Sequence, residues 1–210
     1  LTVNKIIKQI ELFKTGLPFI NLESAATIQN GILQLSESEK QAYINLFDSK
    51  RNKHSIIKFV PASGAATRMF KSFFSFIEDY NPDQETVNAY INRTKESLLA
   101  VFFVGLEKLP FYNIVLNKIK DIYPDYHQSS TDMQRYMFVK TMLDPDKLNF
   151  GFYPKGLLPF HKYKEHIATA FEEHLFEAAL YASTNNKAHL HYTISEKYKD
   201  IFVFFHLSAP

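Results

Sequence analysis

Two short segments of the chain carry residue types that bind phosphate in proteins. The first, VPASGAATRM, begins at Val60 and has small residues followed by Thr67 and Arg68. Small side chains let an anion approach backbone N–H groups, and an arginine offers a planar pair of donors to phosphate oxygens. Small residues also occur where a turn packs tightly beneath another element, so this turn alone is a weak signal.

The second segment is YPKGLLPF, residues 153–160, in which Lys155 stands between two prolines. Proline restricts its own backbone and that of the preceding residue. A stiff loop is suited to presenting a compact positive charge to a fixed phosphate, although a solvated lysine in a proline-rich connection is the alternative. Together the two segments predict a two-part phosphate clamp in which Lys155 meets Arg68.

The elements that position these segments are typical of an α/β fold. A buried strand of a parallel sheet is indicated by the apolar, partly β-branched residues Ile56, Ile57, Phe59 and Val60, and Pro61 ends it. A second strand is expected in AHLHYTIS, residues 188–195, which gives the order strand, crossover, strand. The crossover includes a largely helical insertion at about 70–149, and we expect its first helix to start near Thr67.

Apolar periodicity predicts the remaining helices. We divide the chain into a helical lead-in, residues 1–54, and an α/β domain, residues 55–210. Residues 22–35 of the lead-in form either a shorter helix or an irregular linker. Further helices are expected at 4–16, 36–47, 84–109, 111–123, 130–143, from 165 to the Asn-Asn pair at 185, and from about 196.

Composition excludes several classes of protein. Hydrophobic residues make up 46% of the 210, so the chain is globular, and a net charge of +2 gives no basis for a nucleic-acid partner. Cysteine is absent, and no apolar run is long enough to cross a membrane. We therefore expect a cytoplasmic, soluble protein without a membrane partner. Because the chain starts at Leu1 and stops at FFHLSAP, we also expect a fragment of a longer protein.

The two segments resemble the signature of the sugar-nucleotide pyrophosphorylases and related nucleotidyltransferases. The family's first strand leads into a leucine-alanine-glycine-glycine-x-glycine-threonine-arginine turn, and residues 61–69 follow that order with serine and alanine at two glycine positions. The family's second motif, proline-lysine-x-leucine-x-proline, matches residues 154–159. This resemblance implies the N-terminal part of a three-layer sheet like that of nucleotide-diphospho-sugar transferases (GT-A-like), with helical additions.

The resemblance also implies roles for particular residues. Arg68 would hold the triphosphate and Lys155 would neutralise phosphate charge during transfer, so both are candidate catalytic residues, with Mg²⁺ as the cofactor. The strand at 191–195 lies where the family's second strand approaches the base. The residues expected to contact the nucleotide are Ala62, Ser63, Gly64, Ala65, Ala66, Thr67 and Thr193.

Several longer phrases resemble an uncharacterised bacterial family typical of Bacteroidetes, domain of unknown function 4301. They are VPASGAATRMFK, PKGLLPFHKY, ATAFEEHLFEAALYA and HYTIS. This resemblance covers most of the chain, implies a longer parent protein, and brings no established activity.

Histidines support a different hypothesis. On one helix Glu173, His174 and Glu177 are close in sequence, and His189 and His191 share a face of the second strand. A metal-dependent hydrolase could use such a set, but the helix has one copy where di-metal bundles need two, so we assign no metal ligands. Polar contacts of these side chains are the simpler explanation.

The residues just after the lysine loop are weaker candidates for substrate contacts. These are His161 and Tyr163, selected by position alone, and a hydrogen bond from His161 to the loop backbone is the alternative.

Our leading hypothesis is a nucleotidyltransferase-like domain that binds a nucleoside triphosphate or nucleotide sugar and a phosphorylated small molecule. The reaction would be transfer of a nucleotidyl group to a sugar phosphate. A catalytically silent binding or scaffold domain is the first alternative, and a histidine- and glutamate-based metal hydrolase is the second.

Overall fold

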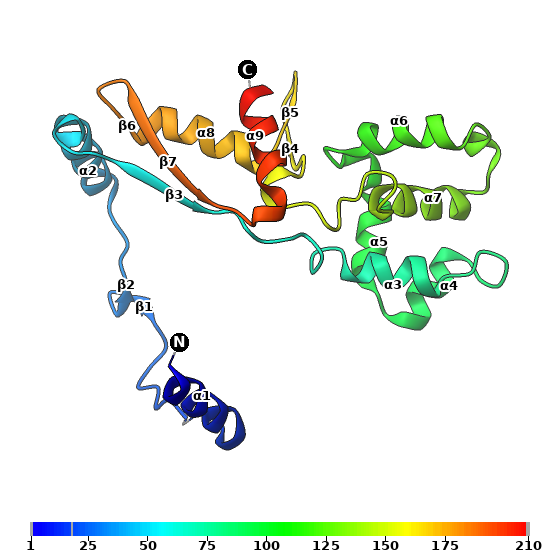
Figure 1. Ribbon diagram of the computed structural model, residues 1–210, viewed down its shortest axis with the longest axis horizontal. Coiled ribbons are helices and arrows are strands. Elements are labelled where there is room, and N and C mark those ends of the chain that lie inside the picture. Colours follow the sequence, from blue (N-terminus) through cyan, green and yellow to red (C-terminus); the bar gives the residue numbers. More distant parts are fainter. Residues whose placement is uncertain (1, 18, 209–210) are drawn as a thin grey trace. The chain divides into compact units, whose positions relative to one another are not determined.

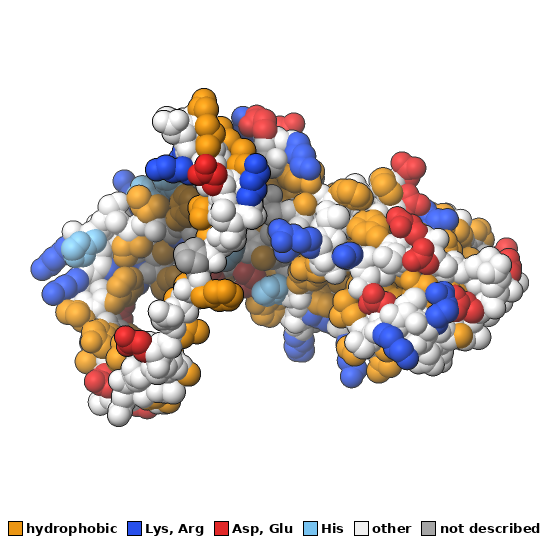
Figure 2. Space-filling view, turned by 90° about the horizontal axis from the view of Figure 1, so that it is seen from below, with side chains coloured by type: hydrophobic (Ala, Val, Ile, Leu, Met, Phe, Trp, Pro, Cys, Tyr) orange, Lys and Arg blue, Asp and Glu red, His pale blue; other side chains and the backbone are white. Residues whose placement is uncertain are grey.

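A computed structural model describes residues 2–17 and 19–208, with side chains as far as Val203. The chain divides into two compact units, unit 1 (Leu1–Lys50) and unit 2 (Arg51–Pro210). The described part of the chain has no helix with the length and apolar character that crossing a membrane requires. Acidic and basic side chains are interspersed over the face drawn in Figure 2, in keeping with the small net charge.

Unit 1 contains two helices and two very short strands (Figure 1). Helix α1 (Val3–Thr15) ends at Gly16, whose φ of 79° is accessible to glycine without strain. Helix α2 (Glu37–Lys50) begins with a reciprocal cap, in which the Ser36 amide donates to Glu39 Oε2 and the Glu39 amide donates to Ser36 Oγ. Both helices are confirmed.

The segment between these helices is not helical. Strand β1 (Thr27–Ile28) pairs in parallel with β2 (Gly31–Ile32) over a very short stretch. The shorter helix that we considered for residues 22–35 is therefore wrong, because the backbone hydrogen bonds of this segment close a tight turn instead.

Unit 2 has a small sheet in which the two predicted strands lie side by side and parallel. Strand β3 (Ile57–Pro61) pairs with β7 (Lys187–Thr193), with Ile57 opposite His189 and Pro61 opposite Thr193. A short strand, β6 (Ser183–Thr184), adds to β7 in the antiparallel sense. Because the pair is parallel, both strands end at the same edge of the sheet.

The two faces of this sheet differ in what covers them. Helix α8 (Ala170–Tyr181) lies against β7, and its Phe171 ring contacts the ring of Tyr192. The opposite face carries Ile57 and Phe59, whose exposed fractions are 55% and 63%. The sheet is therefore covered on one face among the described residues.

The crossover between the strands contains a bundle of short helices. They are α3 (Lys71–Asp79), α4 (Val87–Thr94), α5 (Ser97–Val104), α6 (Tyr112–Ile122) and α7 (Thr131–Leu143). Short 3-10 turns at Leu106–Lys108 and Tyr126–Gln128 connect some of them, and another, Arg51–Lys53, precedes β3. The helical insertion is thus present between β3 and β7.

Two helix boundaries in the insertion differ from the sequence predictions. The long helix expected at 84–109 is wrong, because Lys95 adopts a left-handed φ of 61° and separates α4 from α5. The start expected near Thr67 is also wrong, since residues 67–70 form a turn and α3 begins at Lys71.

The chain between the insertion and β7 contains the lysine loop, a hairpin and α8. The 3-10 turn Lys155–Leu157 is followed by β4 (His161–Lys162) and β5 (Ile167–Ala168), which pair in the antiparallel sense. A helix start at residue 165 is therefore wrong. Helix α8 begins only after Thr169, which forms a capping box with Glu172.

After β7, a 3-10 turn (Glu196–Tyr198) leads into α9 (Lys199–Ser208), as predicted. Tyr198 and Phe202 from this region pack with Leu157 and Phe171 in a small hydrophobic cluster of their own. Unit 2 therefore has two apolar cores, a large one within the helical bundle and this smaller one beside the sheet. The mixed α/β class is confirmed.

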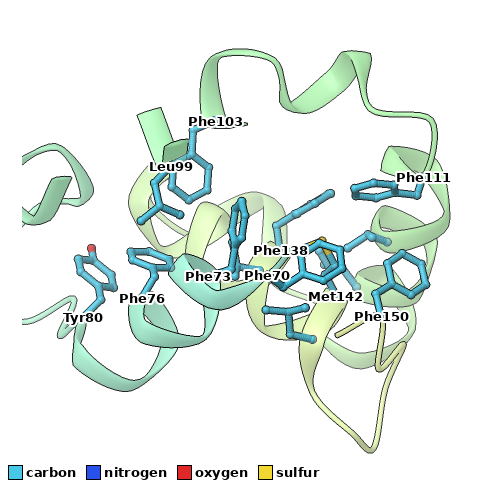
Figure 3. Close-up of a cluster of buried hydrophobic side chains, with 14 of the residues drawn as sticks. Phe70, Phe73, Phe76, Tyr80, Leu99, Phe103, Phe111, Phe138, Met142 and Phe150 are labelled. Atoms are coloured by element: carbon cyan, nitrogen blue, oxygen red, sulfur yellow. The ribbon is translucent and has the colours of Figure 1, made fainter. Parts of the chain in front are cut away.

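The large core is dominated by aromatic rings (Figure 3). Phe76 is fully buried in this core and contacts the rings of Tyr80, Tyr90 and Phe103 at centroid distances of 4.8, 5.2 and 5.7 Å. Stacked and edge-on rings at such distances contribute beyond the area that they bury. The high aromatic content of the sequence is thus used mainly as core.

We predict that Phe76→Ala lowers the free energy of unfolding by about 3–5 kcal/mol, because it removes a buried ring and leaves a cavity. Phe59→Ala is the matched control, since Phe59 is 63% exposed and its loss should change stability by less than about 1 kcal/mol. Urea unfolding followed by far-UV circular dichroism measures both. Equal losses in the two variants would contradict this assignment of the core.

Candidate functional site

The predicted turn and the predicted lysine loop are joined to each other by backbone hydrogen bonds. The amide of Lys155 donates to the carbonyl of Gly64, and the amide of Ala66 donates to the carbonyl of Tyr153, each at 3.0 Å. Ala65 and Pro154 face each other between these bonds as an isolated antiparallel bridge. Segments far apart in the sequence are therefore paired directly at the end of β3.

Packing and side-chain bonds fix this pairing on both sides. Ala66 and Leu158 are fully buried in the large core, and Tyr153 packs against both cores. Thr67 Oγ1 donates to the carbonyl of Gly151 at 3.1 Å, and Tyr198 Oη donates to the carbonyl of Phe152 at 2.6 Å. The turn and the loop are held as one body.

The turn itself exposes backbone donors. Ala62 donates its N–H to the carbonyl of Thr193 at 2.9 Å, which extends the sheet by one bond. The amides of Ser63, Gly64 and Ala65 have no acceptor among the described residues. None of residues 61–68 has a positive φ, so the alanines lie in this turn without strain. The free amides belong to the turn and not to the first turn of α3.

A cavity of about 330 Å³ opens beside the paired segments, and we refer to it as the turn–loop cavity. It lies at the carboxyl ends of β3 and β7, where ligands bind in open α/β sheets. Its lining residues come from β3, the turn, the lysine loop, α8, β7 and α9. They are Val60, Pro61, Ala62, Gly64, Met69, Lys155, Gly156, Phe160, Ala170, Phe171, His174, Tyr192 and Phe202.

Only some of the predicted site residues line this cavity. Lys155, Gly64 and Ala62 do, while Ser63, Ala65, Ala66 and Thr67 belong to the same turn without lining it. Ala66 is buried, and the hydroxyl of Thr67 is bonded to the backbone of Gly151.

The structure does not bring the Arg68 side chain to the cavity. Arg68 is exposed in the turn before α3 and is absent from the lining. Thr193 is likewise exposed, and its contribution is the carbonyl that accepts the Ala62 amide, while its neighbour Tyr192 lines the cavity. The structure therefore does not show the predicted convergence of Arg68 and Lys155 on one cavity, because the side chain of Arg68 is exposed in the turn before α3.

His161 and Tyr163 lie elsewhere. Tyr163 Oη donates to Glu173 Oε1 at 2.6 Å, and His161 Nδ1 is 3.5 Å from the same oxygen. Tyr163 lines a larger, mostly apolar cavity of about 480 Å³ between the β4–β5 hairpin and α8. The two residues are thus held by α8, and neither lines the turn–loop cavity.

Sequence reasoning did not assign two polar residues that line the turn–loop cavity, His174 and Tyr192. His174 was considered as a metal ligand or, more simply, as a side chain in polar contacts. Tyr192 could have been found from the period of two along β7, because it shares a face with Leu190 and lies on the side that α8 covers. Burial raises the pKa of Tyr192 to about 12, and the nearby charge of Glu177 adds to this effect.

A polar network on α8 and β3 adjoins His174. Glu177 Oε2 accepts hydrogen bonds from Lys58 Nζ and from Tyr181 Oη, and it lies 3.2 Å from His174 Nδ1. These bonds, that of Lys58 first, lower the pKa of Glu177 to about 2, so its carboxylate is ionised at neutral pH. Burial alone would lower the pKa of Lys58, but its hydrogen bonds to Glu177 and Tyr181 outweigh burial and raise that pKa.

The described residues offer no ready metal site. No group of three or more histidine, aspartate and glutamate side chains among them is placed to hold a metal ion. His189 and His191 lie on the open face of the sheet, where they are the cross-strand neighbours of Ile57 and Phe59. The hydrolase hypothesis therefore gains no support from this part of the chain.

The fold and the site define a mixed α/β domain with a turn–loop cavity at the carboxyl edge of a parallel strand pair. The chain belongs to the family described as Domain of unknown function (DUF4301), whose model matches residues 1–206. Comparisons with curated proteins and with solved structures gave no match.

We predict that the Glu177 network makes stability depend on pH. Because the pKa of Glu177 in the folded state, about 2, lies below its ordinary value of 4.5, its contribution is present above about pH 4.5 and is lost as the pH falls toward 2. Wild type should therefore exceed Glu177→Gln in stability at pH 7, and the difference should close in acid.

Urea unfolding at a series of pH values and low salt measures this difference, which should shrink in high salt because Glu177 is partly exposed. Glu165→Gln is the control, since Glu165 is 79% exposed and, among the described residues, its ion-pair partner is Lys164, which is 93% exposed. A difference between wild type and Glu177→Gln that persists unchanged at pH 2 would contradict the prediction.

Proposed function

We propose that unit 2 is a nucleotidyltransferase-like domain that binds a nucleoside triphosphate or a nucleotide sugar in the turn–loop cavity. The observation that carries this proposal is the backbone pairing of Gly64 with Lys155, because both residues line one cavity and the amide of Gly64 has no acceptor among the described residues. A three-layer sheet of the nucleotide-diphospho-sugar-transferase type is part of the proposal.

The chemistry of the cavity suits a phosphorylated ligand. Lys155 is exposed and has no ion-pair partner among the described residues, so its charge is available to phosphate oxygens. The free amides of Ser63, Gly64 and Ala65 are further donors of the kind that bind phosphate through backbone. A volume of about 330 Å³ is at the small end for ligand sites and suits a phosphate group with part of the molecule that carries it.

The proposed reaction is transfer of the nucleotidyl group to a sugar phosphate. A phosphate oxygen of the sugar phosphate attacks the α-phosphorus of the triphosphate, and the bond from that phosphorus to the bridging oxygen breaks. Pyrophosphate leaves with the electron pair of that bond. Lys155 and the turn amides would stabilise the negative charge that develops on the phosphoryl oxygens, and Arg68 would bind the outer phosphates.

Mg²⁺, which neutralises phosphate charge when bound, stays a prediction from the family resemblance. None of the side chains that line the turn–loop cavity is a carboxylate. These residues do not fit a metal held by protein oxygens, so the proposed step uses only the chain's own positive and N–H groups.

The absence of a carboxylate from the lining favours a second candidate, a domain that binds nucleotides without turning them over. Incubation with each nucleoside triphosphate and glucose 1-phosphate, with pyrophosphate release as the readout, distinguishes the two. Release above the level of a Lys155→Ala variant supports the transferase, and binding without release supports the silent domain.

We predict that Lys155→Ala weakens nucleotide binding at least tenfold, because a charged hydrogen bond to phosphate contributes about 1.5–3 kcal/mol. Calorimetric titration with ATP, GTP, CTP, UTP and UDP-glucose measures the dissociation constants. Lys164→Ala is the matched control, since Lys164 is highly exposed in the β4–β5 turn, pairs with Glu165 and lies outside the cavity lining. If both variants bind as wild type does, the proposed site is wrong.

A second prediction concerns the backbone of the turn. A Cβ at Gly64 would meet nothing of the protein within 4 Å, and its φ is not positive, so Gly64→Val should leave stability within about 1 kcal/mol of wild type. The added methyl groups would cover the free amides, and we expect nucleotide affinity to fall at least tenfold in the same titrations. Unchanged affinity in a stably folded variant would show that phosphate does not contact this backbone.

A further inference from the structure

Two polar side chains line the turn–loop cavity on the side that α8 and β7 form, and each keeps a polar atom without a protein partner. His174 contacts Glu177 through Nδ1, and no described residue bonds to its Nε2. The hydroxyl of Tyr192 is buried, and it has no hydrogen-bond partner among the described residues.

The surroundings of His174 define what its free nitrogen can do. Glu177 is ionised and only accepts hydrogen bonds, so the Nδ1 nitrogen of the neutral ring carries the proton and donates it. Lys58 and Tyr181 hold the carboxylate from β3 and from the next turn of α8. Nε2 is then an acceptor of fixed orientation, and Glu177 is its positioning residue.

Tyr192 supplies the complementary group. A buried hydroxyl without a partner costs free energy, and a small shift of the Tyr192 ring on binding would let a ligand oxygen accept a hydrogen bond from it and remove that cost. The rings of Phe171 and Phe202 also line the cavity and are 5.4 Å apart between centroids. One acceptor, one donor and apolar rings are the groups that recognise a sugar ring, which has hydroxyls at its edge and C–H groups on its faces.

We propose that His174 and Tyr192 bind the hydroxyl groups of a sugar or ribose ring whose phosphate lies at Lys155 and the turn. This inference rests on the proposed function and adds to it the part of the ligand that is recognised beside the phosphate, the hydroxyls of a sugar or ribose ring, and two binding residues. His174 accepts a hydrogen bond from one hydroxyl, and Tyr192 donates one to another.

The test compares ligands with and without hydroxyls. Wild type, His174→Ala and Tyr192→Phe are titrated calorimetrically at pH 8 with UDP-glucose, ADP-glucose and inorganic pyrophosphate. Each variant should bind the two nucleotide sugars about five- to tenfold more weakly, the effect of one lost hydrogen bond, and should bind pyrophosphate as wild type does. His166→Ala, at the larger cavity, is the control and should bind all three probes like wild type.

Two variants of Glu177 test its role as a positioning residue. Glu177→Ala removes the acceptor for His174 Nδ1 and should weaken binding of the two nucleotide sugars while leaving pyrophosphate binding unchanged. Glu177→Gln, whose amide oxygen can still accept from Nδ1, should regain most of the lost affinity. Equal weakening of all three probes in Glu177→Ala would overturn the assignment.

The outcomes separate this inference from the proposed function. If wild type binds none of the three probes, the proposed function fails and the inference falls with it. If wild type binds them but His174→Ala and Tyr192→Phe match wild type, or weaken pyrophosphate as much as the nucleotide sugars, the assignment of a sugar-binding wall is overturned and the phosphate site stands.

Discussion

The backbone pairing of Gly64 and Ala66 with Lys155 and Tyr153 is the constraint on which the site of unit 2 depends. It ties the turn that follows β3 to a loop on the far side of the helical insertion. Because Tyr153 packs against both apolar cores, the same short bridge links the helical bundle to the sheet and α8. Backbone bonds give this link a geometry that does not depend on the rotamers of long side chains. A cavity wall built in this way is pre-organised for a ligand.

The lining of the cavity combines groups that suit a phosphate with groups that suit hydroxyls. Gly64 and Lys155 line it together with His174, Tyr192 and apolar rings. The ionised Glu177 does not line the cavity and is paired with Lys58, so its charge is kept from an incoming phosphate while it orients His174. This combination of groups is the physical basis of the proposed ligand class.

Much of this arrangement could be predicted from sequence, and the failures have physical causes. The strands at 57–61 and 187–193 and their parallel order follow from local apolar patterns and from the α/β connection rule. The nearness of the lysine loop to the turn was predicted from the phosphate-binding residue types of both segments and from a family resemblance, because no local pattern encodes a bridge between residues so far apart. Lys95 interrupts a helical pattern because its backbone is left-handed, and a lysine side chain gives no indication of that conformation in the sequence.

The site residues show the same limits. Arg68 was assigned by residue type, yet the start of α3 at Lys71 leaves it in an exposed turn. The assignment of His174 and Tyr192 to the cavity lining could not be made from sequence, because it depends on which face of the sheet α8 covers.

The most direct test of the account is a nuclear magnetic resonance titration of ¹⁵N-labelled protein with UDP-glucose. The account predicts saturable shifts of the amide signals of Ser63, Gly64 and Ala65, together with that of Lys155. Amides on the open face of the sheet, such as that of Phe59, should stay in place. Binding that shifts other amides while these four do not move would contradict the assignment of the turn and the lysine loop as the ligand site.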